Sequence, residues 1–241
     1  AQVIYSLLDI FSIIVHHALF CLIVAMSECK KQKLEDYSVH FPPAEAKALV
    51  FDCDGTIVDT MPTHLTAWIR TGTEYGFEFN KELLLKGAGR AEDEQLIEIF
   101  KNQGLEPIDF KKVVDRKFQI FKELCAKEHP PAIKAVIAVI NEGKRRGLPM
   151  AVVSGSVREM VVGALEAVGV KDNFAIILGR EDYNKGKPDP EPFLLAAEKL
   201  GVAPEDCVGY EDAENAGMAS IKAAGYLKAE FVKDFLDYPQ L

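Results

Sequence analysis

The stretch from Ala48 to Thr56 constrains the fold of this chain more than any other, because a short apolar run ends in two acids. Residues 48–51 have the length and the β-branched or aromatic content of a strand that is covered on both faces. Asp52 and Asp54 follow directly, and Gly55 permits a sharp turn. Open α/β sheets bind their ligands at the carboxyl ends of the strands. Both carboxylates are therefore expected at a ligand-binding edge.

The spacing of these two acids suggests chemistry. Carboxylates so close together repel each other, and they stay ionised when a cation lies between them. Oxygen ligands at this density suit Mg²⁺. An Asp can also attack phosphorus as a nucleophile, and a second Asp can then protonate the leaving oxygen. The alternative is that Asp54 and Gly55 form a simple turn that closes the strand.

Strand and helix patterns alternate from residue 130 onward. Strands are predicted at 149–154, 174–178, 207–210 and within 226–232, and helices at 131–146, 157–168, 191–200 and 213–224. Such repetition builds a parallel sheet through right-handed crossovers. Residues 61–129 instead show helical periodicity alone. The prediction is an α/β protein with a Rossmann-like three-layer core, residues 47–60 and 130–241, and an inserted α-helical cap domain, residues 61–129.

Residues 1–46 are predicted to be an N-terminal extension or a leader. The apolar run within residues 7–26 would suit a membrane anchor, but Asp9 and two histidines interrupt it and no basic residues precede it. We favour the interpretation that Met26 is the natural start, because an ordinary polar amino terminus follows it. Membrane anchoring and organelle targeting are the alternatives to a cytoplasmic location.

Charge and cysteine content exclude several functions. A net charge of -9 and a pI near 5.2 argue against nucleic-acid binding, because a phosphate backbone would be repelled. The five cysteines are widely spaced and form no CxxC pair, so neither a disulfide framework nor a zinc site is expected. A reducing, intracellular setting fits best. Partners should be small or neutral overall, and a phosphorylated substrate is compatible with this charge only where basic residues are concentrated locally. The sequence leaves the oligomeric state open, with a monomer favoured.

Polar residues also follow the later strands. Ser154, Gly155 and Ser156 precede a helix, where a hydroxyl and backbone N–H groups can bind an anion, although Ser154 could also be a plain N-cap. Lys187 precedes a rigid proline and could neutralise nearby carboxylates and hold a phosphoryl oxygen; the alternative is a solvated loop lysine.

Acids end the strand at 207–210 as well. Glu211 and Asp212 could bind a metal, or they could simply complement the dipole of the helix that follows. Chemically active residues thus recur at one predicted sheet edge. This recurrence favours a functional role for Asp52 and Asp54 over a simple turn.

Together these residues resemble a known family. Residues 52–56, Ser154, Lys187 with Pro188, and Glu211 with Asp212 are similar in type and order to the four motifs of the haloacid dehalogenase superfamily. The insertion after the first strand resembles the helical (C1) cap subfamily, which includes β-phosphoglucomutase and small sugar-phosphate phosphatases. The resemblance spans residues 47–225.

The resemblance implies roles for the motif residues. Asp52 would attack phosphorus and form an aspartyl-phosphate, and Asp54 would act as general acid and base. Ser154 and Lys187 would hold the phosphoryl group. The implied Mg²⁺ ligands are Asp52, the Asp54 carbonyl, Asp212 and Glu211, the last either directly or through a neighbouring ligand. The substrate would also be bound by Gly55, Thr56, Gly155 and Ser156. The presence of Asp54 argues against a haloacid dehalogenase activity, which does not need this acid.

The cap carries the specificity signal in this subfamily. His64, Arg90 and Lys117 resemble cap positions that contact the far side of the substrate, although a packed His64 and a solvated Lys117 are the alternatives. Thr56 is typical of the phosphatases, whereas the mutases carry an apolar residue there. The resemblance therefore favours a Mg²⁺-dependent phosphatase acting on a small phosphorylated metabolite, with a sugar phosphate as the preferred candidate. The alternatives are a hexose-phosphate mutase and a catalytically silent binding protein with the same fold.

Overall fold

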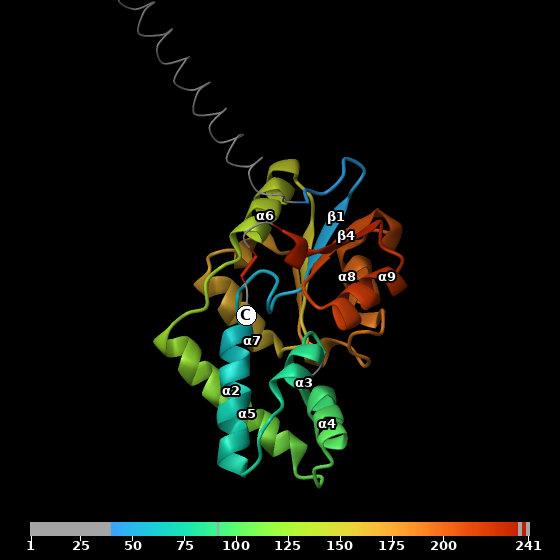
Figure 1. Cartoon of the computed structure of the whole chain (residues 1–241). Helices are drawn as coiled ribbons and strands as arrows, with labels where there is room; N and C mark the ends of the chain where they lie inside the picture. Colours follow the sequence, from blue (N-terminus) through green and yellow to red (C-terminus); the bar gives the residue numbers. More distant parts are fainter. Residues whose placement is uncertain (1–39, 91, 236–237, 240–241) are drawn as a thin grey trace, which may run out of the picture. The chain divides into compact units, whose positions relative to one another are not determined.

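A computed structural model describes residues 40–90, 92–235 and 238–239 of the chain. The described residues contain a parallel sheet with the strand order β3-β2-β1-β4-β5 (Figure 1). The strands are β1 (Ala48–Phe51), β2 (Met150–Val153), β3 (Ile176–Leu178), β4 (Cys207–Glu211) and β5 (Lys228–Phe231). The predictions of a leader or an anchor concern residues outside the described part. Among the described helices, none is long and apolar enough to cross a membrane.

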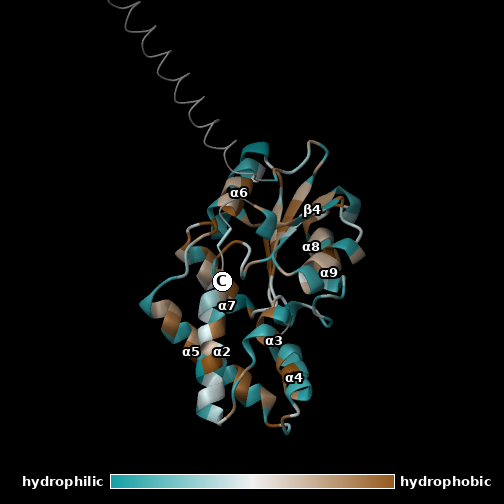
Figure 2. Cartoon of the chain, in the orientation of Figure 1, coloured by the Kyte–Doolittle hydropathy of each residue, from teal (hydrophilic) through white to brown (hydrophobic). Residues whose placement is uncertain are grey.

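The sheet is covered on both faces. Every residue of β1 and β2 is buried, which explains why both read as unbroken apolar runs. Figure 2 shows the apolar colouring along these central strands. Val50 and Val153 pack with Phe193 and Ile221 from the helices on one face. The predicted strand between residues 48 and 51 is confirmed.

Helices flank the sheet on either side (Figure 1). They are α6 (Lys134–Arg146) and α7 (Arg158–Ala167) on one face, and α8 (Glu191–Leu200) and α9 (Ala219–Ala223) on the other. Short 3₁₀ turns lie at Lys171–Asn173, Arg180–Asp182, Pro204–Asp206 and Val232–Asp234. Gly147 and Gly201 end α6 and α8 with φ of 67° and 68°, a left-handed conformation that glycine adopts without a steric penalty.

One predicted helix is wrong in its first half. Instead of a single α-helix over 213–224, the structure has a π-helical turn at Glu214–Met218 that continues into α9. The N–H of Met218 donates to the carbonyl of Ala213 at 3.0 Å, which is the wide hydrogen bond of such a turn. A side chain at Gly217 would overlap the Glu211 carboxyl group. The wide turn therefore brings bare backbone against the end of β4.

The segment between β1 and α6 is helical. It consists of α2 (Met61–Tyr75), α3 (Lys81–Lys86), α4 (Glu92–Gln103) and α5 (Phe110–Lys127). Trp68, Leu96, Phe100 and Val113 form its own apolar core. The side chain of Asp109 accepts a hydrogen bond from the N–H of Lys112 and so fixes the start of α5. The predicted fold class, a parallel α/β core with a helical insertion, is confirmed.

Candidate active site

The sheet order brings distant acids together. The chain passes from β1 to β2 on one side and later returns to β4 on the other, so the topology switches beside β1. Phe51 and Tyr210 are register partners at the ends of β1 and β4. Asp52 and Glu211 are the next residues along these neighbouring strands. Such a switch point, at the carboxyl edge of the sheet, is where open α/β folds bind ligands.

Lys187 lies between these acids. Its Nζ is 2.6 Å from Asp52 Oδ1 and 2.8 Å from Glu211 Oε1, and it donates to the carbonyl of Val153 at 3.2 Å. The Lys187–Pro188 peptide bond is cis. Burial alone would lower the pKa of Lys187, but the charges of Asp52 and Glu211 raise it above the ordinary value. The ammonium group therefore stays charged although it is fully buried.

Asp52, Glu211 and Asp212 form a cluster of buried carboxylates. One oxygen of each lies within 4.8 Å of the others. Burial raises the pKa of Asp52 to about 7 and that of Asp212 to about 6, and it also raises the pKa of Glu211. Asp52 Oδ2 is buried and has no hydrogen-bond partner among the described residues. Three converging, buried carboxylates form a set of hard oxygen donors that fits a divalent cation such as Mg²⁺.

The other two acids of the cluster are held by partners. Glu211 bonds Lys187 through Oε1, and its Oε2 accepts from the N–H of Ala213 at 2.6 Å. Asp212 Oδ2 lies 3.2 Å from Lys233 Nζ and 3.4 Å from the Tyr238 hydroxyl. Glu211 therefore positions Lys187, while Asp52 keeps an oxygen available.

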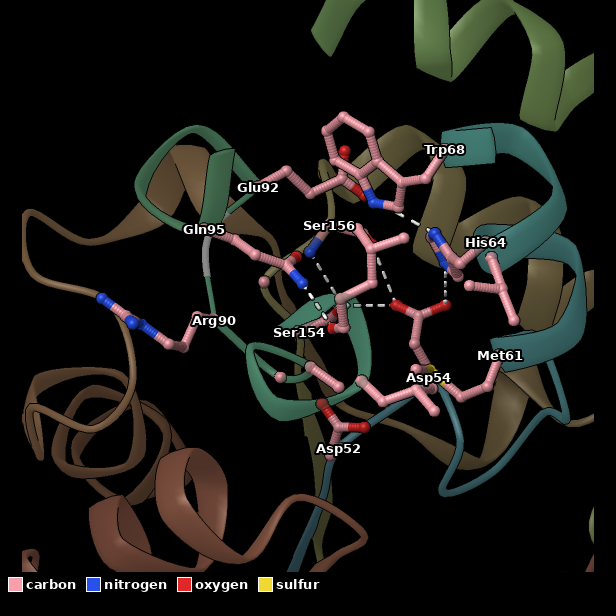
Figure 3. A pocket seen from close by; sticks show the side chains of 16 residues that line it. Asp52, Asp54, Met61, His64, Trp68, Arg90, Glu92, Gln95, Ser154 and Ser156 are labelled. Atoms are coloured by element: carbon pink, nitrogen blue, oxygen red, sulfur yellow. Dashed lines mark hydrogen bonds and ion pairs between the residues drawn. The ribbon is translucent and has the colours of Figure 1, made fainter. Parts of the chain in front are cut away.

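Asp54 accepts hydrogen bonds from four side chains, of which His64, Ser154 and Ser156 are drawn in Figure 3. Thr60 and His64 bond its Oδ1 at 2.8 and 3.2 Å, and the hydroxyls of Ser154 and Ser156 donate to its Oδ2 at 2.9 Å each. Burial alone would raise the pKa of Asp54, but these partners, His64 first, hold it well below its usual range. Asp54 is therefore an ionised base in this arrangement.

Lys117 connects the cap to Asp54 through His64. It is fully buried, and its Nζ lies 2.6 Å from His64 Nδ1 and pairs with Glu92. The rings of Trp68 and Phe121 each lie 5.3 Å from the same ammonium group. Because Nδ1 of His64 accepts from Lys117, its Nε2 carries the hydrogen that bonds Asp54. A continuous polar chain thus runs from Glu92 to Asp54.

The loop of the helical insertion that contains Gly89 and Arg90 packs directly against the carboxyl edge of the sheet. A Cβ at Gly89 would lie 2.7 Å from Ala213 Cβ, and a Cβ at Gly155 would lie 2.8 Å from the Arg90 carbonyl oxygen. The cavity between loop and sheet edge has a volume of about 50 Å³. A space of this size holds no more than a few water molecules. The structure therefore shows the helical insertion packed closely over this edge of the sheet.

Comparison with known proteins identifies the family. Residues 46–225 match the profile of the haloacid dehalogenase-like hydrolases. The chain belongs to this family. The hydrolase is 33% identical over 184 residues to β-phosphoglucomutase of Bacillus subtilis, which covers 74% of this chain and 80% of that protein. It is 30% identical over 179 residues to the fructose-1-phosphate phosphatase YqaB of Escherichia coli, with 73% and 92% covered.

A solved structure shows the same fold. The β-phosphoglucomutase of Clostridium difficile matches this hydrolase with a TM-score of 0.68 at 24% identity, covering 77% of this chain and 84% of that one. The family resemblance deduced from the motifs is confirmed, and the protein is an enzyme of the hydrolase family. Its relatives include sugar-phosphate phosphatases and a phosphomutase.

The site of the hydrolase brings together most of the residues predicted from sequence. Those that line the pocket are Asp52, Asp54, His64, Arg90, Ser154, Gly155 and Ser156. Three other predicted site residues do not line the pocket. Thr56 is buried and its hydroxyl lies 3.5 Å from Asp212 Oδ1, Gly55 turns the chain with φ of 85°, and Lys117 contacts pocket residues rather than the pocket itself. Their predicted contacts with substrate and metal stay predictions.

Several residues of the site carry no signal in the sequence. Glu92 lines the pocket, but in sequence it is one of three acids at the start of a helix, a common dipole-complementing pattern. Trp68 and Gln95 also line the pocket and read as ordinary helix residues. Lys233 and Tyr238 reach Asp212 from the C-terminal segment, where no motif marks them. Only long-range contacts reveal these roles.

Proposed function

We propose that this hydrolase is a Mg²⁺-dependent phosphatase that hydrolyses a sugar phosphate through an aspartyl-phosphate on Asp52. The observation that carries the proposal is the state of Asp52: it is buried, one oxygen lies 2.6 Å from Lys187, and the other has no described partner. A fixed cation on one oxygen and an open second oxygen suit a nucleophile for phosphorus. The names of two relatives, a fructose-1-phosphate phosphatase and a β-phosphoglucomutase, support a sugar phosphate.

In the first step, Asp52 Oδ2 attacks phosphorus and the bond from phosphorus to the sugar oxygen breaks. Lys187 and the Ser154 hydroxyl hold the phosphoryl oxygens, and Asp54 gives a proton to the leaving oxygen. Asp54 must be protonated for this. We infer that the entering phosphoryl group takes over the Ser154 and Ser156 hydroxyls, which now bond Asp54. Losing two donors and gaining a negative neighbour both raise the pKa of Asp54.

In the second step, water attacks phosphorus, Asp54 accepts its proton, and the bond between phosphorus and Asp52 breaks to release phosphate. Asp52, Asp212 and the Asp54 carbonyl would hold Mg²⁺, with Glu211 keeping Lys187 in place. When bound, the ion supplies positive charge that stabilises the charge on the transferring phosphoryl group. We also propose a cytoplasmic monomer, and the net charge of -9 argues against nucleic-acid binding.

The test is phosphate release from a panel of sugar monophosphates in the presence of Mg²⁺. We expect turnover by the wild-type protein and none by Asp52→Asn, which should keep the wild-type circular dichroism and melting temperature. Incubation with β-glucose 1-phosphate and a bisphosphate primer, followed by phosphorus NMR, tests the mutase alternative. Isomerisation without free phosphate would overturn the proposal in favour of a mutase, and no reaction with either would favour a silent binding protein.

A further inference from the structure

The wall of the active-site pocket that the helical insertion forms, here called the cap wall, contains a carboxylate oxygen without a hydrogen-bond partner. Glu92 Oε1 pairs with Lys117 and lies 3.5 Å from His64 Nδ1. Its Oε2 is buried and has no hydrogen-bond partner among the described residues. Glu92 lines the pocket together with Trp68 and Gln95 (Figure 3). A buried acceptor left without a donor is unfavourable, so a hydrogen-bond donor on the ligand would stabilise this arrangement.

The cations around the same wall already face carboxylates. Arg90 pairs with Glu98 on α4. Figure 3 shows the guanidinium group of Arg90 pointing away from Asp52 and Asp54. Lys117 is matched by Glu92 as described above. Arg180, from the loop after β3, lies 3.6 Å from Glu94 on α4. Each of these described cations therefore already has a carboxylate partner, although the Nε atoms of Arg90 and Arg180 make no hydrogen bond among the described residues.

The rest of the wall is apolar. Trp68, Met61, Leu84 and Leu85 line the pocket beside Glu92. Such a surface accepts the carbon face of a small ring or chain, while a few polar groups fix its orientation. The part of the substrate that carries no phosphate therefore meets apolar side chains and one unmatched acceptor. This combination suits carbon atoms that bear hydroxyl groups.

We propose that Glu92 is a specificity-determining residue that selects monophosphates whose remaining part bears hydroxyl groups. Its Oε2 accepts a hydrogen bond from a substrate hydroxyl, and because this oxygen has no proton to donate, it disfavours a phosphate oxygen in the same place. The inference rests on the proposed phosphatase function and specifies its substrate class. A mutase that works through a sugar bisphosphate needs the opposite charge balance on this wall.

The wild-type protein provides the first test, because it needs no variant that could misfold. Initial rates are compared for fructose 1-phosphate, for its deoxy analogues, for fructose 1,6-bisphosphate and for 4-nitrophenyl phosphate, which has no hydroxyl group outside the phosphate. We expect at least one deoxy analogue and the bisphosphate to lose about 10-fold in kcat/KM, the effect of about 1.4 kcal/mol from one hydrogen bond to a charged group. Equal rates for all four classes would overturn the inference.

The variant Glu92→Gln assigns the effect to this residue. Its ratio of kcat/KM for fructose 1-phosphate over 4-nitrophenyl phosphate should fall by about 10-fold, because a charged acceptor is replaced by a neutral one. Its discrimination against the bisphosphate should weaken as well. Glu94→Gln is the matched control, because Glu94 lies on the same helical turn and faces Arg180. The control should keep the wild-type ratio.

The outcomes separate the two proposals. If the protein hydrolyses all phosphates without preference, or if Glu94→Gln changes the ratio as much as Glu92→Gln, the role of Glu92 is wrong while the phosphatase function stands. If the protein hydrolyses none of them, the phosphatase function is wrong and the inference falls with it. The melting temperature of each variant shows whether a decrease in the kcat/KM ratio results from destabilisation of the fold.

Discussion

The hydroxyl of Tyr238 donates to the carbonyl of Gly55 at 2.7 Å and lies 3.4 Å from Asp212 Oδ2. Gly55 belongs to the turn after Asp54, and Tyr238 lies 183 residues further along the chain. Its pKa is raised well above the ordinary value by burial and by the nearby carboxylates, so the phenol keeps its proton. Tyr238 of the C-terminal segment therefore connects the loop after β1 to the acid that follows β4.

The variant Tyr238→Phe tests this connection. We expect a loss of about 1 kcal/mol in the free energy of unfolding, because a part-buried hydrogen bond disappears. The Mg²⁺ concentration that gives half of the metal-induced rise in melting temperature should also increase. Tyr226→Phe is the control, because that hydroxyl donates to the Phe193 carbonyl at 2.7 Å away from the site. The control should lose similar stability and keep the wild-type Mg²⁺ dependence; equal Mg²⁺ effects in both would contradict the role of Tyr238.

The variant Lys187→Met removes the cation between Asp52 and Glu211. Activity should fall by at least 10³-fold, because the positive charge that holds the phosphoryl group is lost. Stability should fall by about 3 kcal/mol at pH 8, since buried carboxylates are left unpaired, and by less at pH 6, where they can take up protons. Chemical denaturation at both pH values measures this. Lys185→Met, on the exposed part of the same loop, should change neither quantity.

The variant Asp212→Asn tests how much the buried negative charge of Asp212 destabilises the metal-free protein. Burial raises the pKa of Asp212 from 3.8 to about 6, so the native state binds more protons than the unfolded state between these values. This group therefore makes the metal-free protein less stable as pH rises from about 4 to 6. Above pH 6, Asp212→Asn should be more stable than wild type by roughly 2–3 kcal/mol without metal.

Added Mg²⁺ should reverse the order of the two proteins, because the ion stabilises only the site that can bind it. Melting curves of both proteins at pH 7.5, with Mg²⁺ and with a chelator, measure the difference. Asp172→Asn, an exposed acid on the turn at Lys171–Asn173, serves as the control and should follow wild type in both conditions. A wild-type protein that is the more stable one without metal would contradict this prediction.

The variant His64→Asn tests what keeps Asp54 ionised. His64 is the largest of the influences that lower the pKa of Asp54, and burial opposes it. Without His64, the pKa of Asp54 should rise. Because Asp54 must be ionised to accept the proton of water, the acidic limb of the plot of kcat against pH should then move to higher pH. His129→Asn, at the end of the helical insertion, should leave the profile where it is. An unshifted profile in His64→Asn would contradict the assignment.

Much of the fold follows from local sequence. The apolar run at β1 is fully buried, and the predicted helix over 191–200 has the bounds of α8. The order of the four motifs was enough to place them at one edge of a parallel sheet, because crossover connections leave few alternatives. The motif residues Asp52 and Lys187 do meet, with Lys187 between two carboxylates.

Contacts between distant segments could not be deduced in the same way. The polar contacts of Lys117 with Glu92 and His64 depend on how three helices of the insertion pack together. In the sequence, each of these residues alone looks like an ordinary helix position. The π-helical turn at Glu214–Met218 depends on the fit of Gly217 against Glu211. Sequence periodicity carries no information on either, because it records only neighbours along the chain.

The sequence by itself therefore determined the strands, the helical insertion and the family, because these depend on local patterns of apolar and polar residues and on the order of the motifs. Only the tertiary structure decided which oxygens have partners: Asp52 Oδ2 and Glu92 Oε2 have none among the described residues, whereas Asp54 has several. The physical reason is that protonation and hydrogen bonding depend on distances of a few ångströms between segments that folding alone brings together.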